Sequence, residues 1–228
     1  MHFYIAGATG RNGSIALDTA LANGHSVTIL ARNPASVKQQ QHPNLTIIKG
    51  TVTSQKDVET ALSTPIKPQV VITTINPRRT SESPFAPLAP ESPEDLLEST
   101  ARILLDAIRN VYGTQNRPKI VVNSSLGVGS SWSYMPLPFK LIFRMSTMIL
   151  TIRDHDNMDK LIRESGLIFV LARPARLTET PSKGVTVLPD NGKGLSWSAA
   201  IGRQDVGEWL VRAAESHEWD GKSPVLVN

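Results

Sequence analysis

Apolar residues along the chain alternate between short β-branched runs and stretches with helical spacing. The runs are typical of strands covered on both faces of a sheet, and they occupy residues 3–6, 26–31, 45–48, 69–75, 119–123 and 167–172. The helical spacing predicts helices from about residue 11 to 23, then at 55–62, 92–111, 139–152, 154–165 and 204–214, and Asn33-Pro34 offers a further helix start. The alternation predicts an α/β fold, a Rossmann-type doubly wound parallel sheet with helices on both faces and a short C-terminal extension.

Two loops interrupt this pattern, after the fourth and the fifth predicted strand. Residues 76–92 contain four prolines among serines and acids, and residues 124–138 are rich in glycine and serine. Loops of this length are usually functional, and both leave the sheet at the carboxyl ends of its strands, where ligands of such folds bind. We therefore expect the site at this edge, in a single domain of residues 1–228 whose segment 174–228 forms a small substrate-side region.

Two of the predicted helices carry specific expectations. Ser92 followed by Pro93 predicts a helix that starts at Ser92 as its cap. The helix at 139–152 is apolar apart from Lys140 and Arg144, so we expect it to pack in the core or to form the wall of an apolar pocket. An oligomer contact and a membrane-surface helix are its alternatives, although the latter favours a fuller basic face.

Composition excludes several classes of protein. Hydrophobic residues make up 40% of the 228 residues and charged residues 19%, which indicates a globular chain. The chain has no cysteine, which excludes disulfides and thiolate metal sites; no other metal-ligand cluster is found either. The net charge of +4 comes without a basic run longer than Arg78-Arg79, so we expect no nucleic-acid partner. We expect a cytoplasmic protein, because no signal-like or membrane-spanning stretch is present. The oligomeric state stays open.

A glycine-rich loop follows the first predicted strand and opens the first predicted helix. Gly7, Gly10 and Gly13 have the spacing G-x-x-G-x-x-G. In the first βα turn of such a sheet, the glycines allow a sharp turn, a close approach to phosphate, and close packing of helix on strand. The helix N-terminus then faces the pyrophosphate of a dinucleotide.

The end of the second predicted strand indicates which dinucleotide. An acid at this point accepts a hydrogen bond from the ribose of NAD, whereas an arginine accommodates the 2′-phosphate of NADP. The sequence has Arg32 there and no acid, and Arg11 of the glycine loop adds a second positive charge. The cofactor is therefore predicted to be NADP.

Three segments together resemble a known family. They are G-A-T-G-x-x-G at residues 7–13, the arginine after the second strand, and the run D-H-D-N-M-D-K-L-I-R-E-S-G-L at residues 154–167. The chain resembles the atypical short-chain dehydrogenases/reductases with NAD(P)-binding domains. It is most similar to their flavin reductase/biliverdin-IXβ reductase-like branch and next to NmrA-like proteins.

The resemblance implies a role for individual residues. Gly7, Thr9, Gly10, Asn12 and Gly13 would hold the pyrophosphate, and Arg32 the 2′-phosphate. The residues expected near the ribose and nicotinamide are Asn76, Pro77, Arg78, Ser124, Ser125 and Pro174. His155 matches the histidine that lines the substrate pocket of the flavin reductases.

The chain departs from the family at two places. No tyrosine is followed four residues later by lysine, so the usual Tyr-x-x-x-Lys proton donor is missing. Gly50-Thr51-Val52 stands where Gly-Asp-Val is frequent, which affects the contacts to the adenine region but not phosphate binding. Hydride transfer belongs to the cofactor, and a planar conjugated acceptor such as a flavin, a quinone or a polyketide-like aromatic needs little acid help.

Three side chains are candidates for catalysis. His155 has an ordinary pKa of ~6.5, suited to proton donation near neutrality; lining the pocket or a purely structural place are its alternatives. Ser125 is placed to hydrogen-bond a substrate carbonyl, and Tyr134 is a second possible acid. The sequence thus favours an NADP-dependent reductase of a planar or apolar small molecule. A dinucleotide-binding regulator of the NmrA kind and a non-redox isomerase or dehydratase are the alternatives.

Overall fold

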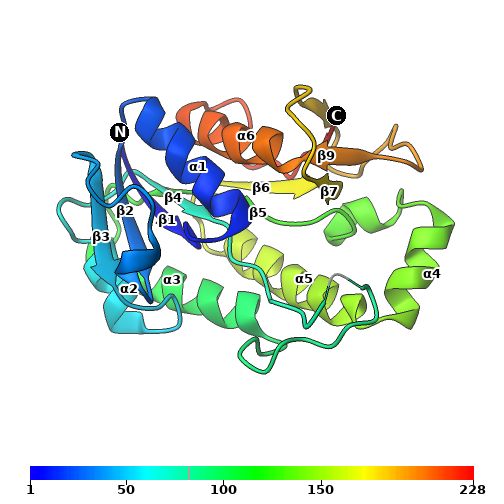
Figure 1. The fold of residues 1–228 in the computed structure, drawn as a ribbon, viewed down its shortest axis with the longest axis horizontal. Coiled ribbons are helices and arrows are strands. Elements are labelled where there is room, and N and C mark those ends of the chain that lie inside the picture. Colours follow the sequence, from blue (N-terminus) through cyan, green and yellow to red (C-terminus); the bar gives the residue numbers. More distant parts are fainter. Residues whose placement is uncertain (82) are drawn as a thin grey trace.

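One eight-stranded sheet organises the molecule (Figure 1). The computed structural model describes residues 1–81 and 83–228. The strand order is β3-β2-β1-β4-β5-β6-β10-β8, and neighbours are parallel except β10 and β8. The strands of this sheet are β1 (His2–Ala6), β2 (Ser26–Ala31), β3 (Leu45–Lys49), β4 (Val70–Thr73), β5 (Lys119–Asn123), β6 (Phe169–Pro174), β8 (Thr186–Leu188) and β10 (Val225–Val227).

Helices cover both faces of this sheet. One face carries α1 (Arg11–Ala22) and α6 (Arg203–Glu215), and the other carries α2 (Gln55–Ala61), α3 (Leu96–Tyr112) and α5 (Met148–Glu164). Successive residues of β1 point into different cores: Phe3 and Ile5 pack under α1 and α6, whereas Tyr4 and Ala6 pack under α2 and α3. This period of two on a doubly covered strand explains why nearly every strand residue is apolar. The predicted fold class is confirmed.

The last quarter of the chain is part of the main architecture. β10 inserts between β6 and β8, and α6 lies along α1. Two further strands, β7 (Arg176–Thr178) and β9 (Ala200–Gly202), form a separate parallel pair. This pairing places the segment after β6 next to the segment that leads into α6.

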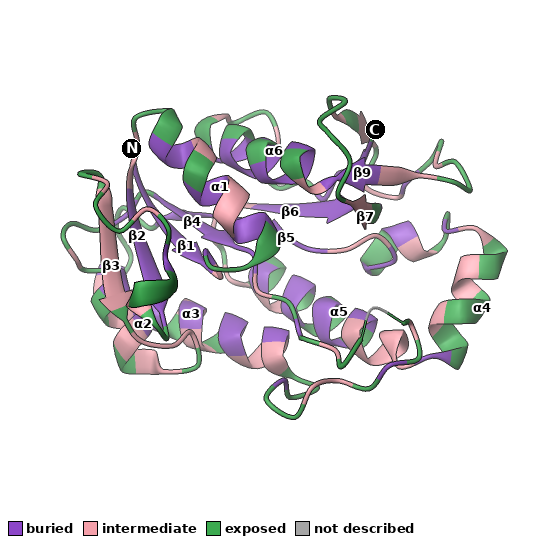
Figure 2. Cartoon of the chain, viewed as in Figure 1, coloured by how far each residue is buried: buried purple, intermediate pink, exposed green. Residues whose placement is uncertain are grey.

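The predicted apolar helix at 139–152 is wrong as a single element. The structure has α4 (Leu137–Met145), a break at Ser146 and Thr147, and then the start of α5. The Thr147 hydroxyl donates to the carbonyl of Ala86 at 2.6 Å, which fixes the break against the proline-rich loop. The expected core packing of α4 is also wrong, because no residue of α4 is buried (Figure 2).

The predicted start of α3 is wrong by three residues. The helix begins at Leu96, and Asp95, which precedes it, makes no side-chain capping bond. The first free backbone N–H groups, of Leu97 and Glu98, donate instead to the two carboxylate oxygens of Asp154, each at 2.8 Å. The Ser92 hydroxyl accepts from the backbone N–H of Arg78 at 2.9 Å. A residue distant in sequence therefore caps this helix, which a local pattern does not reveal.

Two loops contain short 3-10 turns. Asn33-Pro34, expected to start a helix, opens only the 3-10 turn η1 (Pro34–Ser36), in which the Asn33 side chain accepts from Ala35 N–H at 3.2 Å. The loop after β5 contains a second such turn, η2 (Gly129–Trp132). Across residues 1–81 and 83–228, no helix is both long and apolar enough to cross a bilayer.

Candidate functional site

The glycine loop joins β1 to α1 in a tight, fully packed turn. Gly7 has φ of +85°, and its carbonyl accepts from Gly10 N–H at 2.9 Å. A Cβ on Gly13 would lie 2.1 Å from the Gly7 oxygen and 2.5 Å from the Thr74 hydroxyl oxygen. Gly7 thus needs glycine for its backbone angle, and Gly13 needs it for the space between helix and strand. Thr74, which the sequence analysis missed, closes the other side of this turn.

The N-terminus of α1 has the features of an anion site. Gly10 precedes the helix without a side-chain capping bond, and the first turn contains no acid. Thr9, Gly10 and Arg11 are exposed. Backbone N–H groups at such a terminus have no partner within the helix and favour phosphate. The geometry fits the pyrophosphate of a dinucleotide.

Two cations stand at the ends of β2 and β3. Arg32 is exposed immediately after Ala31, the last residue of β2, and Ala31 pairs with the exposed Lys49 at the end of β3. Arg32 forms no ion pair with the part of the chain that the structure describes. Lys49 was missed in the sequence, because only the register places it beside the end of β2.

The departure at Gly50-Thr51 has a structural explanation. Asp57 of α2 accepts from the backbone N–H of Thr51 at 2.9 Å, and a Cβ on Gly50 would lie 2.8 Å from its carboxylate. The carboxylate that orders this turn therefore comes from α2, and it is already used within the protein.

The loop after β4 is held by the second of its two arginines. Arg79 donates to the hydroxyl oxygens of Thr147 at 2.6 Å and Thr151 at 3.1 Å, and to the carbonyl of Ala86. Asn76 and Arg78 are exposed. Arg79 therefore fixes the loop on α5, and of these two arginines it is Arg78 that is exposed.

Polar atoms without partners lie at the end of β5. Ser124 is buried, and its hydroxyl finds no hydrogen-bond partner among the described residues; the same holds for the side-chain oxygen of Asn123. Ser125 is partly exposed and donates to the carbonyl of Leu126 at 3.1 Å. The carbonyl of Pro174, at the end of β6, accepts from Leu126 N–H at 3.0 Å. Buried polar groups are normally satisfied, so these atoms mark a place for a polar ligand group or water.

The burial of His155 changes the role expected for it, which was proton donation near neutral pH. It is 3% exposed, and its Nδ1 has no partner among the described residues. Desolvation by burial lowers the pKa of His155 to about 4, against the opposing charge of Asp159. At neutral pH the imidazole is neutral, so the predicted imidazolium proton donor is not available. Helical spacing correctly placed His155 on the inward face with Met158 and Ile162, but it could not show how completely water is excluded.

The acids around His155 are used in structure. Asp154 caps α3, and Asp156 accepts from Gly129 N–H at 2.8 Å. Asp159 pairs with Arg173, whose side chain is 1% exposed, at 2.8 Å. Arg173 also donates to the Asp190 carbonyl at 2.9 Å. The run at 154–159 therefore ties α5 to α3, to the loop after β5 and to the sheet.

Tyr134 and α4 form an apolar surface beyond the carboxyl edge. Tyr134 is 46% exposed, and its Cβ lies near Gly192 of a distant loop. The exposed large apolar residues of α4 are Leu137, Leu141, Ile142 and Met145. This surface is accessible, in contrast to the buried His155.

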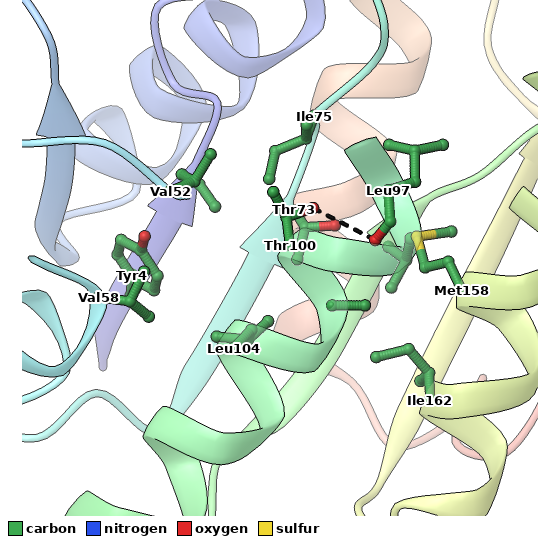
Figure 3. A pocket seen from close by; sticks show the side chains of 13 residues that line it. Tyr4, Val52, Val58, Thr73, Ile75, Leu97, Thr100, Leu104, Met158 and Ile162 are labelled. Atoms are coloured by element: carbon green, nitrogen blue, oxygen red, sulfur yellow. Dashed lines mark hydrogen bonds between the residues drawn. The ribbon is translucent and has the colours of Figure 1, made fainter. Parts of the chain in front are cut away.

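An apolar cavity lies between the sheet, α3 and α5 (Figure 3). Its volume is about 20 Å³, enough for a single water molecule. The Tyr4 hydroxyl on its wall has no partner among the described residues, and burial raises the pKa of Tyr4, with a further contribution from Asp57. The cavity is far too small for a planar substrate. No group of three or more His, Asp or Glu side chains suited to a metal occurs in residues 1–81 and 83–228.

Comparisons with known proteins identify the family of this chain. The profile of a family described as NAD(P)H-binding matches residues 7–217. That span runs from the first glycine of the loop to just beyond α6. The chain therefore belongs to this NAD(P)H-binding family, and the NAD(P)-binding domain expected from the sequence is confirmed.

Solved structures share the whole fold. ChuY, an anaerobilin reductase from Escherichia coli O157:H7, superposes with a TM-score of 0.75 at 16% identity, covering 100% of this chain and 97% of that one. A short-chain dehydrogenase/reductase from Veillonella parvula in complex with NADP gives 0.77 at 15% identity, with coverages of 100% and 94%. The oxidoreductase ylbE from Lactococcus lactis gives 0.74 at 17%, with 100% and 91%.

Proposed function

Because this chain belongs to the NAD(P)H-binding family, we propose that it is an NADPH-dependent reductase of a planar conjugated small molecule. The observation that carries the proposal is the pairing of an α1 N-terminus that has no side-chain cap on Gly10 with the exposed Arg32 at the end of β2. The first supplies a site for pyrophosphate and the second a cation for the 2′-phosphate.

The charges at the ends of β2 and β3 support NADPH rather than NADH as the cofactor. Arg32 and Lys49 are cations at adjacent strand ends. The carboxylate of this region, Asp57, is bonded to Thr51 N–H and faces Gly50. A 2′-phosphate would meet positive charge there, whereas the 2′-hydroxyl of NADH would lack its usual carboxylate acceptor.

A conjugated acceptor suits the acid groups that the site offers. Bound NADPH supplies the hydride, and the protein orients it and excludes water. His155 is neutral and buried, and Tyr-x-x-x-Lys is absent. Ser124 and Ser125 offer hydroxyls at the end of β5, and Tyr134 lies on the accessible apolar surface. An acceptor that takes a hydride readily and then a proton from water requires no more than this.

The substrate would approach from the carboxyl edge. Asn76 and Arg78 on one loop, and Pro174 with the segment 174–228 on the other side, are proposed to border the nicotinamide. The exposed apolar residues of α4 stand at the same end of the molecule. This surface favours an apolar substrate.

The direct test is NADPH oxidation, followed by absorbance, with FMN and a set of quinones as acceptors. Turnover with any of them supports the proposal. In parallel, fluorescence titration should show tighter binding of NADPH than of NADH. Arg32→Ala should weaken NADPH binding about tenfold, as expected for loss of a charge-assisted contact, and leave NADH unchanged. Arg117→Ala, which removes a distant exposed arginine, is the matched control.

The alternative functions make a different prediction for the same experiment. A dinucleotide-binding regulator would bind NADPH and reduce none of the acceptors. An equal affinity for NADH and NADPH, unaffected by Arg32→Ala, would contradict the assignment of Arg32.

A further inference from the structure

We infer that Arg203, at the start of α6, is a further pyrophosphate-binding residue of this protein, and that Glu179 occupies its anion position until the cofactor arrives. The inference rests on NAD(P)H binding, not on turnover. Arg203 lies far along the sequence from the glycine loop, and no sequence motif includes it.

Helix packing brings Arg203 to the glycine loop. A Cβ on Gly207 of α6 would lie 2.4 Å from the Ile15 side chain of α1, so the two helices are in close contact. At their far ends Glu215 accepts from the side chain of Asn23 at 2.9 Å. The helices therefore run in the same direction, and their N-termini lie side by side at the carboxyl edge of the sheet (Figure 1).

Arg203 is held at the first turn of α1. Its Nη1 donates to the side-chain oxygen of Asn12 at 2.9 Å, and its side chain is only 15% exposed. Asn12 is itself 6% exposed and faces α6. A guanidinium carries five donors, and Nη2 of Arg203 donates to none of the described residues. Arg203 thus has a fixed position and an unused donor group beside the N–H groups expected to bind phosphate.

One carboxylate oxygen bridges the two arginines of this region. Oε1 of Glu179 accepts from Nε of Arg203 at 2.7 Å and lies 3.4 Å from Nη1 of Arg11. The strand pair explains the meeting: Thr178 of β7 pairs with Gly202 of β9, so the next residues, Glu179 and Arg203, are neighbours. An anion that contacts two guanidinium groups at a helix N-terminus occupies the kind of position that a phosphate oxygen takes.

Glu179 is well suited to be exchanged. The side chain of Glu179 is 68% exposed, whereas the side chain of Arg203 is largely buried. Exposed ion pairs contribute little to stability because solvent competes for both groups. A diphosphate with more charge and more acceptor oxygens would replace one carboxylate, and Arg203 would stay in place through Asn12.

The charge arrangement distinguishes Arg203 from Arg32. Pyrophosphate is common to NADPH and NADH, whereas the 2′-phosphate is present only in NADPH. Arg203→Gln should therefore weaken both dinucleotides by the same factor, about tenfold for a lost charge-assisted bond. Arg203→Lys should recover part of the affinity. The dependence of Kd on salt concentration should become shallower in Arg203→Gln, because one phosphate contact is lost.

Glu179→Gln should act in the opposite direction. Removing the competing carboxylate should tighten both dinucleotides several-fold, an effect that loss of packing does not produce. Arg212→Gln and Glu208→Gln, exposed positions on the same helix α6, are the charge-matched controls and should leave both Kd values unchanged.

The experiment is fluorescence titration of the full chain with NADPH and with NADH at two salt concentrations, with thermal unfolding of each variant beside it. Equal weakening by Arg203→Gln together with tightening by Glu179→Gln supports the inference. Three results would overturn it: unchanged Kd values in Arg203→Gln, weakening of NADPH alone, or weaker binding in Glu179→Gln. A wild-type protein that binds NADPH but reduces no acceptor would contradict the proposed function and leave this test intact.

Discussion

Gly13 lies so close to Gly7 that a methyl group on Gly13 would come within 2.1 Å of the Gly7 carbonyl oxygen. The same methyl group would lie 2.5 Å from the hydroxyl oxygen of Thr74. Two backbone segments and a side chain from a third therefore meet where the dinucleotide phosphates are expected. The contact links the packing of α1 on the sheet directly to cofactor binding.

Gly13→Ala should damage both properties. Overpacking typically costs about 1–3 kcal/mol, so the free energy of unfolding should fall by that amount. NADPH affinity should fall as well, because α1 must move away from the loop. Urea unfolding and NADPH titration measure the two effects. Gly10→Ala is the graded control for stability, since its Cβ would lie 3.2 Å from the same oxygen; equal losses of unfolding free energy in both variants would contradict the steric argument.

Gly207→Ala tests the contact between α1 and α6. The new Cβ would lie 2.4 Å from Cγ2 of Ile15, and the expected destabilisation is about 1–3 kcal/mol. Ile15→Ala in the same chain removes Cγ2, the nearer of the two clashing atoms, and leaves the Ile15 Cβ at 2.6 Å, so the double variant should be more stable than the sum of the single losses predicts. Strict additivity in urea unfolding would contradict direct contact.

Asp154→Ala tests the cap that α5 supplies to α3. The substitution leaves the N–H groups of Leu97 and Glu98 without acceptors, which should cost about 1–3 kcal/mol of unfolding free energy. Asp154→Asn, with one remaining oxygen acceptor, should lose less. Asp95→Ala is the control, because Asp95 makes no capping bond, and a larger loss there than in Asp154→Ala would refute this assignment.

The burial of His155 predicts that the free energy of unfolding falls at acid pH. Its pKa is about 4 in the folded protein, lowered by burial from the ordinary 6.5. The unfolded chain therefore binds the proton more readily between these values, and stability is present above pH 6.5 and lost as pH falls toward 4. The full loss is about 3 kcal/mol, from the energy per pKa unit.

His155→Gln should flatten that part of the stability profile. Urea unfolding at neutral pH and near pH 4.5 gives the comparison, with His217→Gln as a control at a side chain that is 88% exposed. The same pH slope in wild type and His155→Gln would show that His155 is not the titrating group.

Local features of the chain were predictable from local signals. The glycine loop could be recognised because a positive φ and a close approach require glycine at fixed spacing, and Gly7 and Gly13 show both. The strands could be predicted because a sheet covered on both faces accepts few polar residues. Arg32 could be placed because it directly follows a strand that the pattern defines.

Features that depend on residues far apart in the chain could not be predicted from local signals. The start of α3 was misplaced because its cap, Asp154, lies on another helix. The apolar sequence of α4 suggested burial, yet the chain turns at Ser146 and leaves α4 outside the core. Hydrophobicity predicts a tendency to be buried, and the path of the chain decides whether a surface is available.

The sequence by itself determined the sheet, the glycine turn and the charge after β2, because spacing, backbone angles and residue type act over a few residues. Only the tertiary structure decided that His155 is neutral, that Asp154 is a helix cap, and that Arg203 lies beside Asn12. Each of these depends on what packing places around a side chain. Desolvation and hydrogen bonding are set by such neighbours, and the neighbours come from elements far apart in the chain.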